Sequence, residues 1–346
     1  MAHNSKHFLG AAYLGVLLLS FFYLWEAHAF QRKPMETTLD LVAATNPGTF
    51  ELNDFHAYSE LFVLSDVHGM ASNLLPALKK AKIINEAGHW NAGKAFLLVI
   101  GDSIDKGPSS VDVLDLWIRL EEEAKAAGGN FVHLLGNHEA EFLADPSNDK
   151  AQAFLDELKA KHIAVAELFN TSTKRGSFFA RMPLAAKLGK MLFVHAGFYS
   201  SASWKDFSDR AKSILSTRDY KNDFLIGDTS SLEAKDWWKK RQSRVDQITR
   251  LQSAGFWGMV QGHQPKAYNI DYKIGAIEDG HFVKIDNGMA PEAGSSDPYF
   301  LHLKNLEDLN QNQMPHYMVM DKNGAETPLA PEVFKDSNDN STGSVE

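Results

Sequence analysis

The sequence has no cysteine among its 346 residues. Disulfide bonds, thiolate metal ligands and a cysteine nucleophile are therefore all excluded. The sequence also has fewer basic than acidic residues. It contains 35 lysine and arginine residues and 44 aspartate and glutamate residues, which gives a formal net charge of −9. A long nucleic-acid interface needs a basic stripe that neutralises phosphates. The charge balance therefore argues against a nucleic-acid partner.

An uncharged apolar block, FLGAAYLGVLLLSFFYLW, occupies residues 8–25. The tripeptide AHA at residues 27–29 follows it and fits the small-x-small pattern of signal-peptide cleavage sites. We expect residues 1–29 to be a signal peptide cut after Ala29, which would make the protein exported, periplasmic or secreted. The block is also just long enough to cross a bilayer. An uncleaved membrane anchor formed by residues 8–25 is therefore the alternative.

Short apolar runs alternate with helical patterns from residue 59 onward, and the runs predict strands: LFVL (61–64), AFLLVI (95–100), FVHLL (131–135), MLFVHAG (191–197), GMVQGH (258–263), HFVKID (281–286) and YMVMD (317–321). This alternation indicates an α/β domain with a mixed sheet, which we place at residues 59–325. Residues 30–58 resemble a linker with one weak strand. Residues 231–254 predict a long polar helix, and residues 326–346 predict a disordered tail.

Polar residues collect at the ends of five of these predicted strands. In open α/β sheets, ligands bind at the carboxyl ends of strands. A single aspartate or histidine at such a position is commonly a turn residue or a helix cap. Five polar endings in order along one domain do not fit five independent caps: Asp66 and His68, Asp102 and Asp105, Asn137 and His138, His195, and His263.

The residue types at these strand ends favour metal binding. Carboxylate, carboxamide and imidazole donors together suit Mn, Fe or Zn rather than Ca. Two neighbouring divalent ions bring a charge of about +4, and a bridging hydroxide would bring about −1. If Asp66 and Asp102 are the only charged ligands, a positive charge remains. Such a site favours an anionic substrate, for example a phosphate ester.

Taken in order, the motifs SDVHG, GDSIDKG, GNHE, HAG and GH resemble those of the calcineurin-like metallophosphoesterases. The match is to the phosphoprotein phosphatase (PPP) branch of that family, in its bacterial type, and it extends over about residues 59–290. The resemblance implies a four-layer α/β/β/α sandwich with two mixed β-sheets. It also implies a dinuclear metal site at the carboxyl ends of the strands.

The resemblance further implies a role for each matching residue. Two divalent ions (Mn, Fe or Zn) would be bound by Asp66, His68, Asp102, Asn137, His195 and His263, with Asp102 bridging them. His138 would be the general acid that protonates the leaving oxygen, and Asp105 would orient its imidazole. A metal-bridging hydroxide would attack phosphorus directly, without a phosphoenzyme.

Lys106 departs from the pattern, because phosphatases of the family usually carry arginine there. Arginine holds phosphate oxygens with a two-pronged fork, whereas lysine offers one compact charge. Lysine occurs in the related dinucleoside-tetraphosphate hydrolase-like phosphatases, but those tend to lack the aspartate that this chain keeps as Asp105. We expect Lys106 and Asn137 to bind substrate. Arg241, in DWWKKRQ, is the candidate second phosphate ligand; the alternative for it is the solvated face of a polar helix.

These observations predict a metal-dependent phosphatase that hydrolyses phosphomonoesters. The expected substrate is a phosphoprotein, on serine/threonine or on tyrosine, or a small phosphate ester. One alternative is a dinucleoside polyphosphate hydrolase, which Lys106 favours. A second alternative is a non-catalytic metal- or phosphate-binding protein of the cell envelope. The His138–Asp105 pair argues against that second alternative, since a binding protein needs no proton donor.

Overall fold

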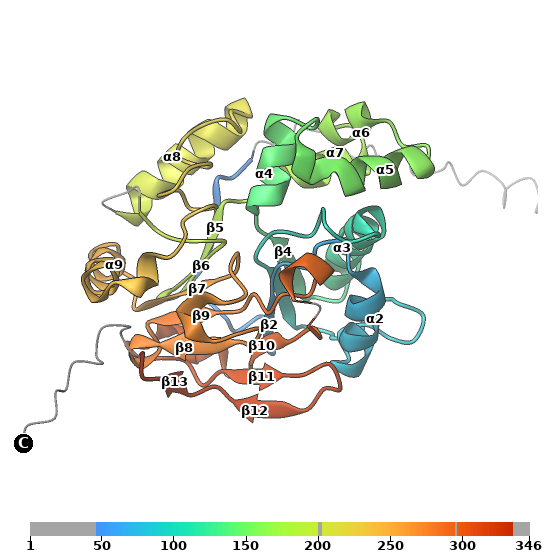
Figure 1. Ribbon diagram of the computed structural model, residues 1–346. Coiled ribbons are helices and arrows are strands. Elements are labelled where there is room, and N and C mark those ends of the chain that lie inside the picture. Colours follow the sequence, from blue (N-terminus) through green and yellow to red (C-terminus); the bar gives the residue numbers. More distant parts are fainter. Residues whose placement is uncertain (1–45, 200–202, 295, 335–346) are drawn as a thin grey trace, which may run out of the picture. The chain divides into compact units, whose positions relative to one another are not determined.

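Two mixed β-sheets carry the fold (Figure 1). The computed structural model describes residues 46–199, 203–294 and 296–334, all within one unit. Within these residues, the larger sheet has seven strands in the order β1 (Thr49–Leu52), β5 (Ala185–Leu188), β6 (Met191–Val194), β7 (Gly258–Gln261), β9 (Phe282–Lys284), β8 (Gly275–Ile277) and β13 (Pro331–Glu332). The smaller sheet has six, in the order β12 (Glu326–Pro328), β11 (Met318–Met320), β10 (Phe300–Leu303), β2 (Leu61–Leu64), β3 (Phe96–Val99) and β4 (Asn130–His133).

Alternate side chains of each central strand face two different hydrophobic cores. In β2, Leu61 and Val63 pack in a core that side chains of both sheets share, whereas Phe62 and Leu64 pack in the core that includes the helices. The same alternation holds in β7, where Val260 joins the first core and Met259 the second. Burial on both faces explains why these strands are unbroken apolar runs in the sequence.

Helices cover the outer faces of the two sheets. The buried faces of α2 (Ala71–Lys80) and α3 (Ser110–Ala126) pack in the second core, and α3 contacts β4. On the larger sheet, α8 (Trp204–Thr217) contacts β1, and α9 (Arg241–Ser253) contacts β7. The two pairs lie on different sides of the sheets in Figure 1. The predicted four-layer α/β/β/α arrangement with two mixed sheets is therefore confirmed.

A group of shorter helices follows β4, and the first of them carries part of the site. These are α4 (Asn137–Ala144), α5 (Gln152–Ala160), α6 (Val165–Phe169) and α7 (Lys174–Arg181). Both α5 and α7 contact α3. Single 3₁₀ turns connect other elements: η1 (Asp149–Ala151), η2 (Trp237–Lys239), η3 (Ala267–Asn269), η4 (Glu278–Gly280), η5 (Pro291–Ala293) and η6 (Leu306–Asn310).

Two sets of three parallel strands position the site. In the smaller sheet β2, β3 and β4 are parallel neighbours, and in the larger sheet β6, β7 and β9 are. The carboxyl ends of each set therefore lie at one edge of its sheet. The polar strand endings found in the sequence follow five of these six strands.

Both segments that flank the predicted domain contain paired strands. Within residues 30–58, which we expected to be a linker with one weak strand, β1 pairs in parallel with β5. Within the predicted disordered tail, residues 326–346, β12 pairs with β11 and β13 pairs with β8. The turn from β11 to β12 contains Asn323-Gly324, a pair that favours tight hairpin turns. The paired strands therefore extend beyond residue 325, where we expected the domain to end.

The long polar helix predicted over residues 231–254 is shorter than expected. The helix α9 begins at Arg241, and η2 precedes it with Trp237 and Trp238 buried. The predicted signal peptide or anchor, residues 1–29, lies outside the described residues. Among the residues that are described, no helix combines the length and the apolar character needed to cross a membrane.

Candidate metal centre

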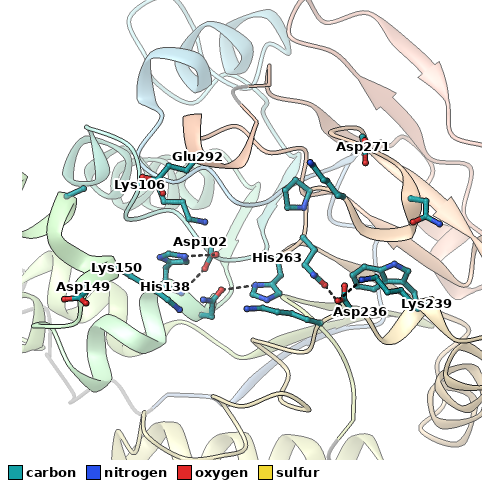
Figure 2. A pocket seen from close by; sticks show the side chains of 18 of the residues that line it. Asp102, Lys106, His138, Asp149, Lys150, Asp236, Lys239, His263, Asp271 and Glu292 are labelled. Carbon is teal, nitrogen blue, oxygen red and sulfur yellow. Dashed lines mark hydrogen bonds and ion pairs between the residues drawn. The ribbon is translucent and has the colours of Figure 1, made fainter. Parts of the chain in front are cut away.

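The loops at the carboxyl ends of both strand sets border a cleft of about 1000 Å³ (Figure 2). Its lining includes Asp102, Asn137, His138 and His263 from the predicted site, together with Lys106. Figure 2 shows Asp102 between the imidazoles of His138 and His263. The cleft is where side chains from both sheets meet.

Asp102 lies at the centre of these side chains and is almost completely buried. Its Oδ2 atom is 3.3 Å from His195 Nε2, 3.6 Å from His68 Nε2 and 4.0 Å from His138 Nε2. Its Oδ1 atom accepts a hydrogen bond from the backbone N–H of His138 at 3.0 Å. Burial opposes its ionisation, but His195 and His138 hold the pKa of Asp102 well below its usual range. One carboxylate thus faces three imidazoles.

Asn137, His195 and His263 form one side of this arrangement. The Oδ1 atom of Asn137 lies 3.1 Å from His195 Nε2 and 3.0 Å from His263 Nδ1. His195 Nδ1 lies 2.8 Å from the Ile100 carbonyl oxygen, which directs Nε2 toward Asp102. Within the described part of the chain, the buried Nε2 atom of His263 has no hydrogen-bond partner. Ligand atoms of Asp102, His195 and His263 all lie within 4.8 Å of one another, so these residues could hold a cation.

His68, His138 and Asp66 form the other side. Ligand atoms of His68, Asp102 and His138 also lie within 4.8 Å of one another. Asp66 Oδ1 lies 3.9 Å from His68 Nε2, and the Asp66 carboxylate accepts the backbone N–H of His263. Burial, and then the nearby carboxylate of Asp286, raise the pKa of Asp66 well above its usual value. A divalent cation here would offset this buried negative charge, so the donor set fits a metal ion.

The backbone is left-handed at several of these residues, with positive φ between 46° and 69° at Asp66, His68, Asp102, Asp105, Lys106 and His263. Such conformations cost of order 1 kcal/mol or more for residues other than glycine, and they cluster at functional sites. Gly136 is required for a steric reason, because a Cβ atom there would collide with Asp102. The loops are therefore shaped so that the strand-end side chains point toward each other.

Glu139 ties two of these loops together. Its carboxylate accepts backbone N–H bonds from Asp102 at 2.8 Å, Ser103 at 2.7 Å and Gly136 at 3.0 Å. The side chain is fully buried, and burial, followed by the Asp102 charge, raises the pKa of Glu139 to about 7. The position of Asp102 therefore depends on Glu139.

A histidine–aspartate pair stands beside the candidate ligands. The Nδ1 atom of His138 and the Oδ2 atom of Asp105 are 2.8 Å apart. Because an ionised carboxylate can only accept, Nδ1 is the donor, and Nε2 remains directed toward Asp102 and the cleft. Lys106 also points into the cleft (Figure 2), with its Nζ atom 2.9 Å from His68 Nε2.

Arg241 does not join this group. It is exposed at the first position of α9 and stands outside the cleft lining that the described residues form. Lysines supply the positive charge of the lining instead: Lys106, Lys150, Lys235, Lys239 and Lys266. The predicted phosphate contact from Arg241 therefore has no support in this geometry.

Asp286 is a buried carboxylate near the candidate ligands that the sequence analysis did not single out. It follows β9, the sixth strand of the two parallel sets, and is buried. Burial raises its pKa to about 6, and its charge acts on Asp66. The signal was present in the sequence, since HFVKID places a carboxylate directly after an apolar strand.

Comparisons with known proteins agree with this architecture. The family model described as calcineurin-like phosphoesterase matches residues 60–287. Shewanella-like protein phosphatase 1 of Plasmodium berghei is 23% identical over 267 residues, which cover 71% of each chain. Shewanella-like protein phosphatase 2 of Arabidopsis thaliana is 31% identical over 85 residues, 25% of this chain and 22% of that protein.

Two solved structures share the fold. A cold-active protein-tyrosine phosphatase of a psychrophilic Shewanella species has a TM-score of 0.64 at 22% identity, with 82% of each chain covered. A protein serine/threonine phosphatase from Saccharomyces cerevisiae has a TM-score of 0.52 at 18% identity, with 84% of this chain and 86% of that chain covered. The chain therefore belongs to the calcineurin-like metallophosphoesterases, and its relatives support the phosphoprotein phosphatase branch of that family.

Proposed function

We propose that this protein is a metal-dependent phosphatase that hydrolyses phosphomonoesters. The observation that supports it most is the position of Asp102, which faces the imidazoles of both sheets next to the His138–Asp105 pair. Two divalent ions bound there would supply an activated water and would polarise the phosphoryl oxygens. The residues of the chain then have to hold the ions, position the phosphate and deliver a proton.

The proposed ligands divide between the two sides of Asp102. Asp66, His68 and Asp102 would hold one ion, and Asn137, His195 and His263, together with Asp102, would hold the other. Every one of these six side chains has a nitrogen or oxygen atom within 4.0 Å of a second member of the set. The donor types allow Mn, Fe and Zn.

His138 is the proposed proton donor. Asp105 accepts the Nδ1 hydrogen bond and thereby fixes the ring plane, so a proton on Nε2 faces the cleft. Transfer of that proton to the ester oxygen turns a poor leaving group into a neutral alcohol or phenol. Lys106 is the proposed contact to a phosphate oxygen, because its ammonium lies in the cleft beside His68.

The proposed substrate is a phosphoprotein. The names of the relatives support this choice, because one is a protein phosphatase and another is a protein-tyrosine phosphatase. The cleft of about 1000 Å³ has room for an aromatic side chain with neighbouring peptide. A dinucleoside polyphosphate remains the second candidate because of Lys106, while the retained Asp105 favours the phosphatase.

A substrate panel tests the proposal. We expect protein loaded with Mn to cleave p-nitrophenyl phosphate and phosphopeptides, and Asp102→Asn to lose at least about a thousandfold in activity. This loss corresponds to the several kcal/mol that a bridging ligand set contributes to the transition state. Phosphotyrosine, phosphoserine and phosphothreonine peptides are compared with diadenosine tetraphosphate in the same assay. Undiminished activity of Asp102→Asn, or cleavage of the dinucleotide alone, contradicts the proposal.

We also propose that residues 1–29 export the protein from the cytoplasm. The support is the apolar block at residues 8–25 followed by AHA. N-terminal sequencing of the mature protein is expected to begin at Phe30. An intact Met1 in a membrane fraction would support the anchor instead.

A further inference from the structure

Asn137 can present either of two atoms to the candidate metal centre. Its side-chain amide has an oxygen that can bind a cation and an NH₂ group that cannot. The oxygen faces His195 and His263 in the structure, as described above. Something must therefore hold the amide in this orientation, and the partner of its NH₂ group identifies what does.

Glu141 is that partner. The Nδ2 atom of Asn137 donates to Glu141 Oε1 at 3.1 Å, and the two residues stand one turn apart on α4. A carboxylate only accepts hydrogen bonds, so it pairs with the NH₂ group and excludes the amide oxygen from its own side. Reversal of the amide would bring an oxygen against the carboxylate and an NH₂ group against the metal position.

Glu141 is itself held on its other sides. Lys150 Nζ, from η1, donates to the same Oε1 atom at 2.6 Å. Glu233, in the loop before η2, donates a hydrogen bond from its carboxyl group to Glu141, since burial and then Glu141 itself raise the pKa of Glu233. The backbone N–H of Gly227 donates to Glu233 at 2.8 Å. The Glu141 side chain is 13% exposed, and its partner Lys150 lines the cleft.

We propose that Glu141 is a positioning residue that fixes the Asn137 amide oxygen toward one ion of the dinuclear site. Glu141 contacts neither the phosphate nor the ion, and it acts through the orientation of Asn137. This inference rests on the proposed function, because it takes Asn137 as a metal ligand. It adds a residue outside the motif that carries the family resemblance.

The test is a titration of metal-free protein with Mn²⁺ in the absence of substrate, measured by isothermal titration calorimetry. Metal analysis of the same samples gives the number of bound ions. We expect the wild type to bind two ions and Glu141→Leu to bind one of them about 10–100-fold more weakly, as is typical when a hydrogen-bond partner of a metal ligand is removed. Glu141→Gln keeps an acceptor for Asn137 Nδ2. We expect it to recover affinity to within about threefold of the wild type, on the scale of one neutral hydrogen bond.

Controls separate orientation from charge and from folding. Glu122→Leu removes a surface carboxylate that pairs with Lys174, and it is expected to bind both ions normally. If Glu141→Leu does not fold by circular dichroism, Glu141→Ala replaces it. Wild-type affinity of the Leu or Ala variant for both ions overturns the inference. An equal loss in Glu141→Gln also overturns it, because the carboxylate charge would then be the cause.

The same titration distinguishes this inference from the proposed function. A wild type that binds fewer than two ions contradicts both. If the wild type binds two ions and Glu141→Leu binds both with the same affinity, only the role of Glu141 is contradicted. The supporting result is two ions in the wild type, one weakened ion in Glu141→Leu and recovery in Glu141→Gln.

Discussion

The loops after β2, β3 and β4 bring two, three and two predicted site residues, whereas the loops after β6 and β7 bring one imidazole each. The loops after β2 and β3 are bound to each other by backbone hydrogen bonds: Asp66 N–H to the Gly101 carbonyl at 3.1 Å, and His68 N–H to the Asp102 carbonyl at 2.9 Å. Glu139, from the segment after β4, accepts the backbone N–H groups of Asp102 and Ser103 in the β3 loop, and it accepts a third from Gly136 in its own segment. The smaller sheet thus provides a self-supporting platform.

The imidazoles of the larger sheet depend on that platform. His195 is oriented by the carbonyl of Ile100, and the backbone of His263 donates to Asp66. The loops near β7 and η2 also carry Lys235, Lys239 and Lys266, which line the outer cleft. The smaller sheet therefore carries most of the candidate site residues, and the larger sheet adds two imidazoles and most of the lysines that line the cleft. Substitutions in the two halves should therefore fail in different ways.

Among substitutions that leave the proposed metal ligands in place, the largest effect is expected for His138→Gln. Loss of the proton donor should lower kcat by about 10²–10⁴-fold, while the bound metal content stays the same. The loss should be smaller for p-nitrophenyl phosphate than for phenyl phosphate, because an acidic leaving group needs little protonation. Steady-state kinetics with both esters checks this. Equal losses on the two esters would count against His138 as the acid.

His263→Ala should affect the metal centre more than the fold. We expect one ion to bind at least about 100-fold more weakly, which exceeds the loss typical for a residue that only hydrogen-bonds to a metal ligand. The free energy of unfolding of the metal-free protein should stay within about 1 kcal/mol, because the platform does not depend on this ring. Calorimetric titration and urea unfolding measure the two effects. His316→Ala, at an exposed histidine, is the control. If His263→Ala lowers the free energy of unfolding but leaves metal affinity unchanged, the proposed difference between the two sheets is contradicted.

Glu139→Gln should show the opposite pattern. One carboxylate oxygen becomes an NH₂ group that faces backbone N–H donors, so we expect a loss of about 1–3 kcal/mol in the free energy of unfolding. Urea unfolding of metal-free protein measures it. The control is Glu122→Gln, which should change stability by less than about 0.5 kcal/mol, as for most surface substitutions. If the two variants are equally stable, the platform does not depend on Glu139.

The smallest effect is expected for Lys106→Ala. Removal of one charged contact to phosphate should raise KM about tenfold, equivalent to about 1.4 kcal/mol, with a smaller change in kcat. Lys239→Ala should stay within about twofold, because Lys239 is already paired with Asp236 at 2.8 Å. A KM change in Lys239→Ala and none in Lys106→Ala would reverse the assignment of the phosphate contact.

Sequence reasoning was most successful for the smaller sheet. Each of β2, β3 and β4 is an apolar run followed at once by a polar motif, and the sandwich buries both faces of such strands. The local sequence predicts a strand less well where pairing with neighbouring strands decides whether the strand forms. The β5 segment AAKL has little intrinsic strand preference, and it becomes a strand because β1 and β6 flank it. The β12 strand was missed although Asn323-Gly324 marks its turn.

Contacts over long distances in the chain limited the prediction of the site. The local motif DWWKKRQ predicts a phosphate contact for Arg241, but the turn at η2 and the start of α9 leave its side chain exposed. Asp286 and Glu141 were missed for different reasons. Asp286 follows a strand like the other site residues, whereas the role of Glu141 emerges only when α4 brings it one turn from Asn137 and η1 adds Lys150.

The most direct test of the account is a crystal structure of Mn-loaded protein with anomalous scattering data. Two peaks are expected to flank the Asp102 carboxylate, one beside Asp66 and His68 and the other beside Asn137, His195 and His263. A single peak away from Asp102, or ions bound by other residues, would contradict the shared-carboxylate centre on which the proposed function depends.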